Sequence, residues 1–213
     1  IGTSAFNSLI DNNMYVGYMY QSNQIHGLTT NSTIKGILDT WYQKNLTRVS
    51  DKIDGNAGFC GDRQPSTSDT SINYQGGTGT TTTYYGRFVN LYRNKQLSFE
   101  CSNISDLYAT SGSEDGNGAL TYPIGLISAD EVSYAGGIFG TNNQSYYLYT
   151  GQNYWTISPF YFNGSAYEFA IYSNGTLGFN RADLSYGVRP VINLRADVTI
   201  TGSGTSTDPY ILS

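Results

Sequence analysis

Helical periodicity is confined to two segments of this 213-residue chain, so most of the fold must consist of strands and loops. The first segment, residues 32–46, has Ser32 or Thr33 to cap its start and apolar residues at three- and four-residue spacing. The second, residues 128–135, combines a Ser128 cap with Glu131 three residues later and is followed by two glycines. We therefore expect two short helices, the first with its apolar face on the core.

Short runs of aromatic and β-branched residues, separated by Gly, Asn and Ser clusters, predict strands elsewhere. The predicted strands are residues 15–20, 84–92, 122–127, 146–149, 154–158, 168–172, 188–192 and 198–200. Residues 66–83 and 110–117 are predicted to be long surface loops. The pattern indicates an α+β fold with irregular twisted antiparallel sheets and long loops, and the length fits one domain over residues 1–213.

Charged residues make up only 13% of the chain, and the net charge is −5. Because nucleic-acid binding requires clustered Lys and Arg, and the 11 basic residues are scattered, a nucleic-acid partner is excluded. No apolar run approaches the roughly 20 residues that a membrane-spanning helix needs. The chain is therefore not expected to span a membrane itself.

The two cysteines, Cys60 and Cys101, are an even number in a polar composition typical of secreted proteins. They predict one disulfide that closes a loop of about 40 residues, with two unpaired buried thiols as the alternative. The disulfide and the polar composition together favour an extracellular or cell-surface location.

Aromatic and Asn residues are denser in residues 142–186 than one core needs. Tyr offers a large rigid contact area and Asn, Ser and Gly offer adaptable hydrogen bonds, which is the chemistry of binding loops. We expect Tyr161, Phe162 and Tyr167 to be exposed, because they follow Pro159 in a turn-like segment. Strand aromatics such as Tyr154 can instead belong to the core.

Catalytic and metal-binding patterns are weak in this sequence. His26 is the only histidine and lacks the partners of a catalytic triad or a usual zinc site. Residues 114–117 have oxygen ligands that suit calcium but not the spacing of a calcium loop. A hydrolase that uses Asp106 and Glu114 is the remaining enzymatic alternative. We predict no catalytic residues, no metal and no cofactor.

Three segments resemble the C-type-lectin-like domains of the formylglycine-generating type. Residues 122–137 are similar to their strand that leads into a capped acidic helix, residues 154–159 to their aromatic strand, and Gly187-Val188-Arg189-Pro190 to their Gly-Phe-Arg element. The resemblance implies a C-type-lectin-like fold with its core motifs in residues 120–195 and an extended amino-terminal half, residues 1–119. The cysteine pair of the enzymes and the calcium-dependent sugar motifs of classical lectins are absent, so neither activity is implied.

The first half and the tail of the chain resemble bacterial surface proteins, some of them pilin-like. Within the fold, the chain also resembles the variable proteins of diversity-generating retroelements, whose ligand-binding residues precede the final Gly-x-Arg strand. That implies a non-enzymatic adhesin at a bacterial or phage surface that binds a protein or a glycan, with a structural pilin-like subunit as the alternative. The implied ligand-binding residues are Asn153, Tyr154, Tyr161, Phe162, Asn163, Ser165, Tyr167, Tyr172, Asn174, Asn180, Arg181 and Tyr186.

Overall fold

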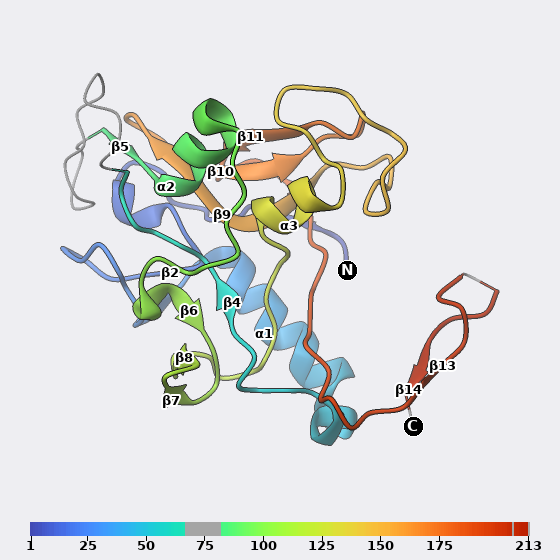
Figure 1. Ribbon diagram of the computed structural model, residues 1–213. Coiled ribbons are helices and arrows are strands. Elements are labelled where there is room, and N and C mark those ends of the chain that lie inside the picture. Colours follow the sequence, from blue (N-terminus) through green and yellow to red (C-terminus); the bar gives the residue numbers. More distant parts are fainter. Residues whose placement is uncertain (67–81, 206, 213) are drawn as a thin grey trace.

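A six-stranded sheet built on one long strand organises the chain (Figure 1). The computed structural model describes residues 1–66, 82–205 and 207–212. The strand order is β1-β12-β9-β10-β11, and β5 pairs with β9 outside this path. The strands are β1 (Thr3–Ser4), β5 (Thr83–Tyr84), β9 (Tyr154–Phe162), β10 (Ala166–Ile171), β11 (Leu177–Arg181) and β12 (Tyr186–Gly187). Both halves of the sequence thus contribute to one sheet.

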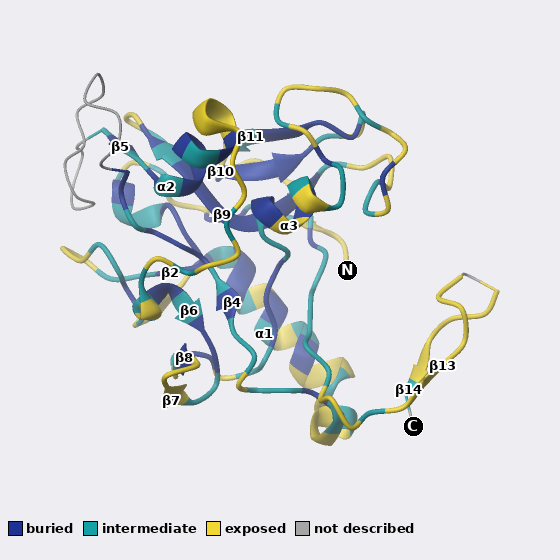
Figure 2. Cartoon of the chain, in the orientation of Figure 1, coloured by how far each residue is buried: buried dark blue, intermediate teal, exposed yellow. Residues whose placement is uncertain are grey.

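The sheet separates two hydrophobic clusters. One cluster joins Trp155 and Ile157 of β9 to Ile34, Leu38 and Tyr42 of helix α1 (Thr33–Asn45), which lies below the sheet in Figure 1. The other gathers β9, β10 and β11 side chains with helices α2 (Gly86–Phe88) and α3 (Ala129–Tyr134). Figure 2 shows buried residues concentrated in the sheet and in the inward faces of these helices.

A β-bulge changes which face of the sheet the residues of β9 occupy. Tyr167 of β10 is opposite Tyr161, but the next residue, Glu168, is opposite Pro159, so Phe160 is the extra residue. As a result Phe160 and Tyr161 both pack on the side of α2 and α3, whereas Phe162 returns to the side of α1.

The remaining elements are short and pair locally. The antiparallel pairs are β2 (Met19–Tyr20) with β3 (Thr30–Asn31), β4 (Phe59–Cys60) with β6 (Leu107–Tyr108), β7 (Gly112–Ser113) with β8 (Gly116–Asn117), and β13 (Ile200–Thr201) with β14 (Ile211–Leu212). Short helices of other types are η1 (Asn13–Tyr15), η2 (Thr47–Lys52), η3 (Val89–Asn94) and η4 (Ile104–Asp106), and η2 has a kink at Val49. The β13–β14 hairpin stands apart from the body of the molecule, and most of its described residues are exposed (Figures 1 and 2).

The α+β class and both predicted helices are confirmed. Helix α1 begins after Ser32, whose side chain accepts the backbone N–H of Lys35, and α3 has the complete capping box of Ser128 and Glu131. The predicted strands at 154–158 and 168–172 correspond to β9 and β10, and a hairpin crosses the predicted loop 110–117. Most of the predicted loop 66–83 lies outside the described residues.

Several predicted strands are wrong. Residues 84–92 form only the end of β5 before the chain turns into α2 and the π-helical turn η3, because this segment packs Phe88, Val89 and Leu91 into the second cluster at helical spacing. Residues 122–127 and 188–192 make only the isolated bridge Gly125–Val191, and 146–149 is a turn. Strand β11 was not predicted.

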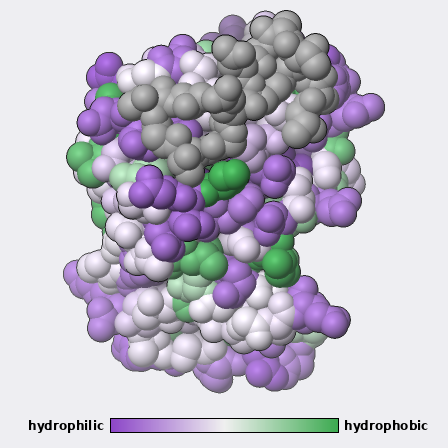
Figure 3. Space-filling view, turned by 90° about the vertical axis from the view of Figure 1, so that its left-hand side faces the viewer, coloured by the Kyte–Doolittle hydropathy of each residue, from purple (hydrophilic) through white to green (hydrophobic). Residues whose placement is uncertain are grey.

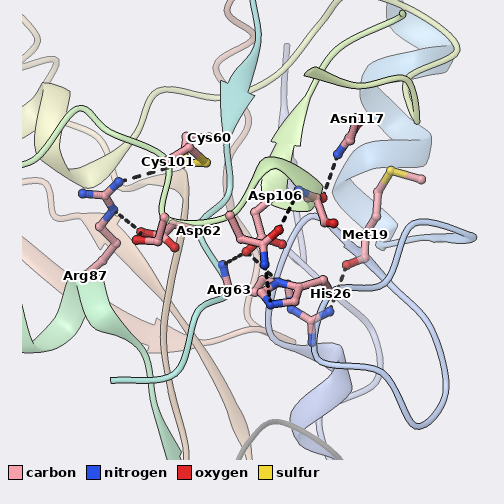
Figure 4. A network of polar contacts seen from close by, with 12 residues as sticks. Met19, His26, Cys60, Asp62, Arg63, Arg87, Cys101, Asp106 and Asn117 are labelled. Atoms are coloured by element: carbon pink, nitrogen blue, oxygen red, sulfur yellow. Dashed lines mark hydrogen bonds and ion pairs between the residues drawn. A yellow bond between two sulfur atoms is a disulfide. The ribbon is translucent and has the colours of Figure 1, made fainter. Parts of the chain in front are cut away.

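Buried ionic groups connect the loops to the sheet (Figure 4). The Arg87 guanidinium contacts the carboxylates of Asp62, at 3.0 Å, and Asp130, at 3.4 Å, and donates to the carbonyls of Ser98 and Glu100. Burial raises the pKa of both carboxyls, and Arg87 opposes that rise. One guanidinium thereby joins three segments that share no sheet with one another.

A second buried group surrounds Arg63 and Asp106. The Asp106 carboxylate accepts the backbone N–H of Arg63 at 2.6 Å and contacts His26 Nδ1 at 2.9 Å, while the Arg63 guanidinium donates to the carbonyls of Met14 and Met19. Gly17 lies against this guanidinium with φ of +122°, and a Cβ there would come within 2.6 Å of Arg63 Cδ. Glycine is therefore required at this position.

The predicted disulfide is confirmed, with Cys60 and Cys101 bonded across 41 residues of sequence. Replacing both cysteines with Ser is expected to lower the free energy of unfolding by about 4 kcal/mol, because the open chain gains loop entropy. Urea unfolding of the two proteins would measure this difference. A decrease of less than about 1 kcal/mol in the free energy of unfolding would contradict a stabilising role for the disulfide. A reductant should not change the stability of the double variant.

Glu168 is fully buried, and burial raises its pKa well above the usual range, although the Gly17 N–H and Arg63 oppose that rise. The folded state thus keeps the proton to higher pH than the unfolded chain, so stability should decline as pH rises above about 4.5. Glu168→Gln keeps an acceptor for Gly17 but cannot ionise. We expect its free energy of unfolding to decline less between about pH 4.5 and pH 8 than that of the parent.

Urea unfolding across this pH range measures that difference. Glu114→Gln, at an exposed position in the β7–β8 turn, is the matched control and should keep the parent profile. If the free energy of unfolding changed with pH in the same way for Glu168→Gln and the parent, the Glu168 carboxyl would not be the cause of the decline.

Candidate functional site

The candidate site is a pocket of about 490 Å³ at the start of β9. Its walls come from the loop before β9, the turn between β10 and β11, the β12 region and residues 1–3. Among the lining residues are Gln152, Asn153, Ser173, Ser185, Tyr186 and Arg189. The volume lies within the usual range for small-molecule sites.

Asn153 holds three of these walls together. Its backbone carbonyl accepts the N–H of Gly187 at 2.9 Å, and its side-chain oxygen accepts the N–H of Ser173 at 2.7 Å. A Cβ at Gly187 would come within 2.7 Å of the same carbonyl, so only glycine allows this close approach. These contacts fix the Asn153 side chain and leave its amide nitrogen without a partner among the described residues.

Tyr154 and Arg189 form the charged end of the pocket. The guanidinium lies over the Tyr154 ring, 4.6 Å from its centroid, and donates to the Leu148 carbonyl at 3.0 Å. The Tyr154 hydroxyl donates to the same carbonyl at 3.1 Å. Burial raises the pKa of Tyr154, so the phenol stays neutral and the arginine supplies the charge.

Tyr186 forms the opposite side and is held by aromatic contacts. Its ring stacks on Trp155 with centroids 4.8 Å apart, and Tyr172 meets it edge-on at 6.4 Å. The Tyr186 hydroxyl accepts the Asn180 side-chain amide at 2.6 Å, and the Tyr172 hydroxyl donates to the Phe179 carbonyl. Five of the predicted residues therefore converge in or behind this pocket: Asn153, Tyr154, Tyr172, Asn180 and Tyr186.

The other predicted residues lie elsewhere on the sheet. Tyr161 and Tyr167 are half-buried and stack with Tyr84 in a row, with centroid distances of 4.7 and 5.6 Å. Arg181 is exposed and paired with Asp183 at 2.6 Å. The structure therefore divides the predicted residues between two regions of the sheet.

The remaining predicted residues are in turns. Asn163 and Ser165 form the β9–β10 turn, where the Asn163 N–H donates to the Ser165 carbonyl. Asn174 is in the β10–β11 turn and donates to Asn142. These turns expose Asn163 to solvent and leave Ser165 and Asn174 half-buried.

The expected exposure of Phe162 is wrong, and Tyr154 also belongs to the core. Phe162 is 0% exposed and Tyr154 is 1% exposed. Strand β9 continues to Phe162 beyond Pro159, and the return to the regular register after the bulge turns the Phe162 ring toward the α1 cluster. Tyr154 contributes to the pocket only as the surface on which Arg189 rests.

Gln152, Ser173, Ser185 and Arg189 were not predicted as site residues. Arg189 was recognised only as part of the Gly-Val-Arg-Pro element, with no role attached. The three polar residues flank predicted binding residues in sequence but have no periodicity of their own. Their convergence depends on pairings between β9, β10 and β12 that the sequence does not reveal.

The carboxylates of the hydrolase and calcium alternatives lie apart from this pocket. Asp106 is fully buried and bonded to Arg63 and His26, so its carboxylate is closed to a substrate. Glu114 and Asp115 are exposed in the β7–β8 turn. Within the described ranges, no three His, Cys, Asp or Glu residues are grouped to hold a metal ion.

The chain matches no known protein family, no curated protein and no solved structure. The C-type-lectin-like fold therefore stays a prediction beyond the α+β class. In the part of the chain that the structure describes, no helix combines the length and apolar character that crossing a bilayer requires.

The division of predicted residues between core and surface can be tested by truncation. Phe162→Ala is expected to lower the free energy of unfolding by about 3–5 kcal/mol, because it leaves a cavity in the core. Tyr167→Ala should cost about 1 kcal/mol, since it removes mainly a surface ring pair. Thermal or urea unfolding measures both, and similar losses for the two variants would contradict the assignment.

Proposed function

We propose that this chain is a non-enzymatic ligand-binding module, an adhesin displayed on a bacterial or phage surface, and that it binds a glycan or protein group in the Asn153–Tyr186–Arg189 pocket. The convergence of uncharged hydrogen-bonding side chains around one guanidinium is the observation that carries this proposal. Such groups give orientation and specificity to a ligand in a small pocket.

The rigidity of the walls supports the same proposal. Asn153, Tyr186 and Arg189 each have fixed intramolecular contacts, so little conformational entropy is lost when a ligand binds. The disulfide supports an oxidising, extracellular setting, where an adhesin operates.

If a retroelement diversifies residues 153–186, the substitutions have to spare the side chains that are packed in the core. Trp155, Phe162 and Phe169 are fully buried, so substitutions there would disrupt packing. Asn163, Ser173 and other exposed turn residues can vary without that cost. We propose that variation across a source population concentrates at these exposed turn positions.

A structural pilin-like subunit is the second candidate, and the β13–β14 hairpin is the observation that favours it. Tyr210 and Ile211 are more than half exposed there, as an assembly contact would require. The face shown in Figure 3 has hydrophobic residues in separate patches among hydrophilic ones, outside the grey segment. That arrangement offers less to a self-assembling shaft than one continuous apolar face would.

Ser185→Trp tests the binding role of the pocket. Ser185 is exposed at the pocket wall, so the indole should obstruct the pocket and leave the core intact. We expect a fluorescently labelled variant to lose at least tenfold in binding to the glycans and cells that the parent protein recognises on a glycan array and on bacterial and epithelial surfaces, or about 1.4 kcal/mol.

Ser50→Trp, at an exposed position in η2, is the matched control and should bind as the parent does. Equal binding by the parent and Ser185→Trp would rule out this pocket as the binding site. Unfolding measurements on both variants exclude a general loss of stability.

A further inference from the structure

Among the residues that the structure describes, Arg189 is the only one that lines the pocket with a charged side chain, and no carboxylate lines it. A guanidinium in a recess without carboxylates attracts anions to that place, even though the net charge of the protein is −5.

The contrast with three other arginines strengthens this observation. Arg87 contacts two buried carboxylates, and Arg181 and Arg195 pair with the nearby Asp183 and Asp197. Arg189 has no acidic partner among the described residues. Its contacts are the Leu148 carbonyl and the Tyr154 ring, which orient the group without neutralising it.

The geometry of Arg189 suits a bidentate partner. Only Nη1 donates to the backbone, so several of the five N–H groups of the guanidinium stay available to a ligand. The planar arrangement of these donors matches the two oxygens of a carboxylate. The half-buried position of Arg189 in the pocket strengthens such a charged hydrogen bond compared with one in open solvent.

The other lining groups complement hydroxyls rather than apolar surface. Asn153 uses its side-chain oxygen for Ser173, so the donor that it offers is its amide nitrogen. Gln152, Ser173 and Ser185 add an amide and two hydroxyls at exposed positions. A ligand that combines a carboxylate with several hydroxyl groups would satisfy both the guanidinium and these neutral groups.

We infer that the pocket binds an acidic sugar, with its carboxylate on Arg189 and its hydroxyls on Asn153, Ser173 and neighbouring polar groups. This inference rests on the proposed binding function and specifies its ligand class. It assigns the preference for acidic over neutral sugars to Arg189.

Glucuronate and glucose are suitable probes, because they differ only in the carboxylate at carbon 6. Backbone amide shifts of Ser173 and Gly187, followed by NMR titration, would report binding in the pocket of the full chain. We expect glucuronate to bind at least tenfold more tightly than glucose. Glucose 6-phosphate is the third probe, and a shift pattern and affinity equal to those of glucuronate would overturn the preference for a carboxylate.

Two variants test the assigned roles. Arg189→Gln should reduce glucuronate affinity at least tenfold and leave glucose affinity within about twofold, whereas the exposed Arg48→Gln, with the same loss of charge, should change neither. Asn153→Asp keeps the oxygen that accepts the Ser173 N–H but places a negative charge in the pocket. Loss of the amide donor should weaken both sugars, and the added charge should weaken glucuronate more than glucose, even if Arg189→Gln disturbs the packing on Tyr154.

Failure of this inference can be distinguished from failure of the proposed function. Equal affinities for glucuronate and glucose, or an unchanged glucuronate affinity in both variants, would overturn the acidic-sugar assignment. If Ser185→Trp still abolished cell or glycan binding in that case, the pocket would remain the binding site for a different ligand. If neither sugar moved the pocket amides and Ser185→Trp had no effect, both proposals would fail.

Discussion

The Arg87 guanidinium is the contact on which the looped half of the structure depends. It binds Asp62 after β4, Asp130 in α3 and two carbonyls in residues 98–100, close to the disulfide at Cys101 (Figure 4). The chain has few long strands or helices to hold these segments by backbone pairing. Removing one partner of a buried ion pair typically costs about 3–5 kcal/mol, because the other charge is left uncompensated. A chain with few charges therefore uses several of them inside the fold.

The shape of the pocket depends on strand pairing in the six-stranded sheet. Its walls are brought together where β12 meets the start of β9, at the single parallel register pair Gly187–Tyr154. The β10–β11 turn reaches the same place through the bond between Ser173 and Asn153. The site is thus formed at the end of the sheet, where Tyr154 and Tyr186 lie in strands and most of the polar lining residues lie in the adjoining loops and turns. The hydrogen bonds of Asn153 and Arg189 hold these two side chains in place before a ligand arrives.

Local signals in the sequence predicted local structure well, and long-range packing explains the errors. The caps at Ser32 and Ser128 act within four residues, so both helices could be placed from sequence. Residues 84–92 have strand-like composition, yet contacts with the sheet select a helix there. The disulfide followed from the even number of cysteines together with the polar composition. Phe162 and Arg189 could not be placed from sequence, because the β9 bulge buries Phe162 and the β12 pairing brings Arg189 to the wall of the pocket.

The bulge in β9 also decides which face of the sheet each part of the strand presents to α1. Before it, Trp155 and Ile157 fix the position of α1, and after it only Phe162 does so. The extra residue, Phe160, stacks on Phe179 with centroids 3.9 Å apart, which holds the displaced register in place. If the strand were regular, the alternation of its side chains would turn Phe162 to the opposite face of the sheet, away from α1. The register of β9 to within a single residue thus decides whether the far end of the strand completes the core around α1.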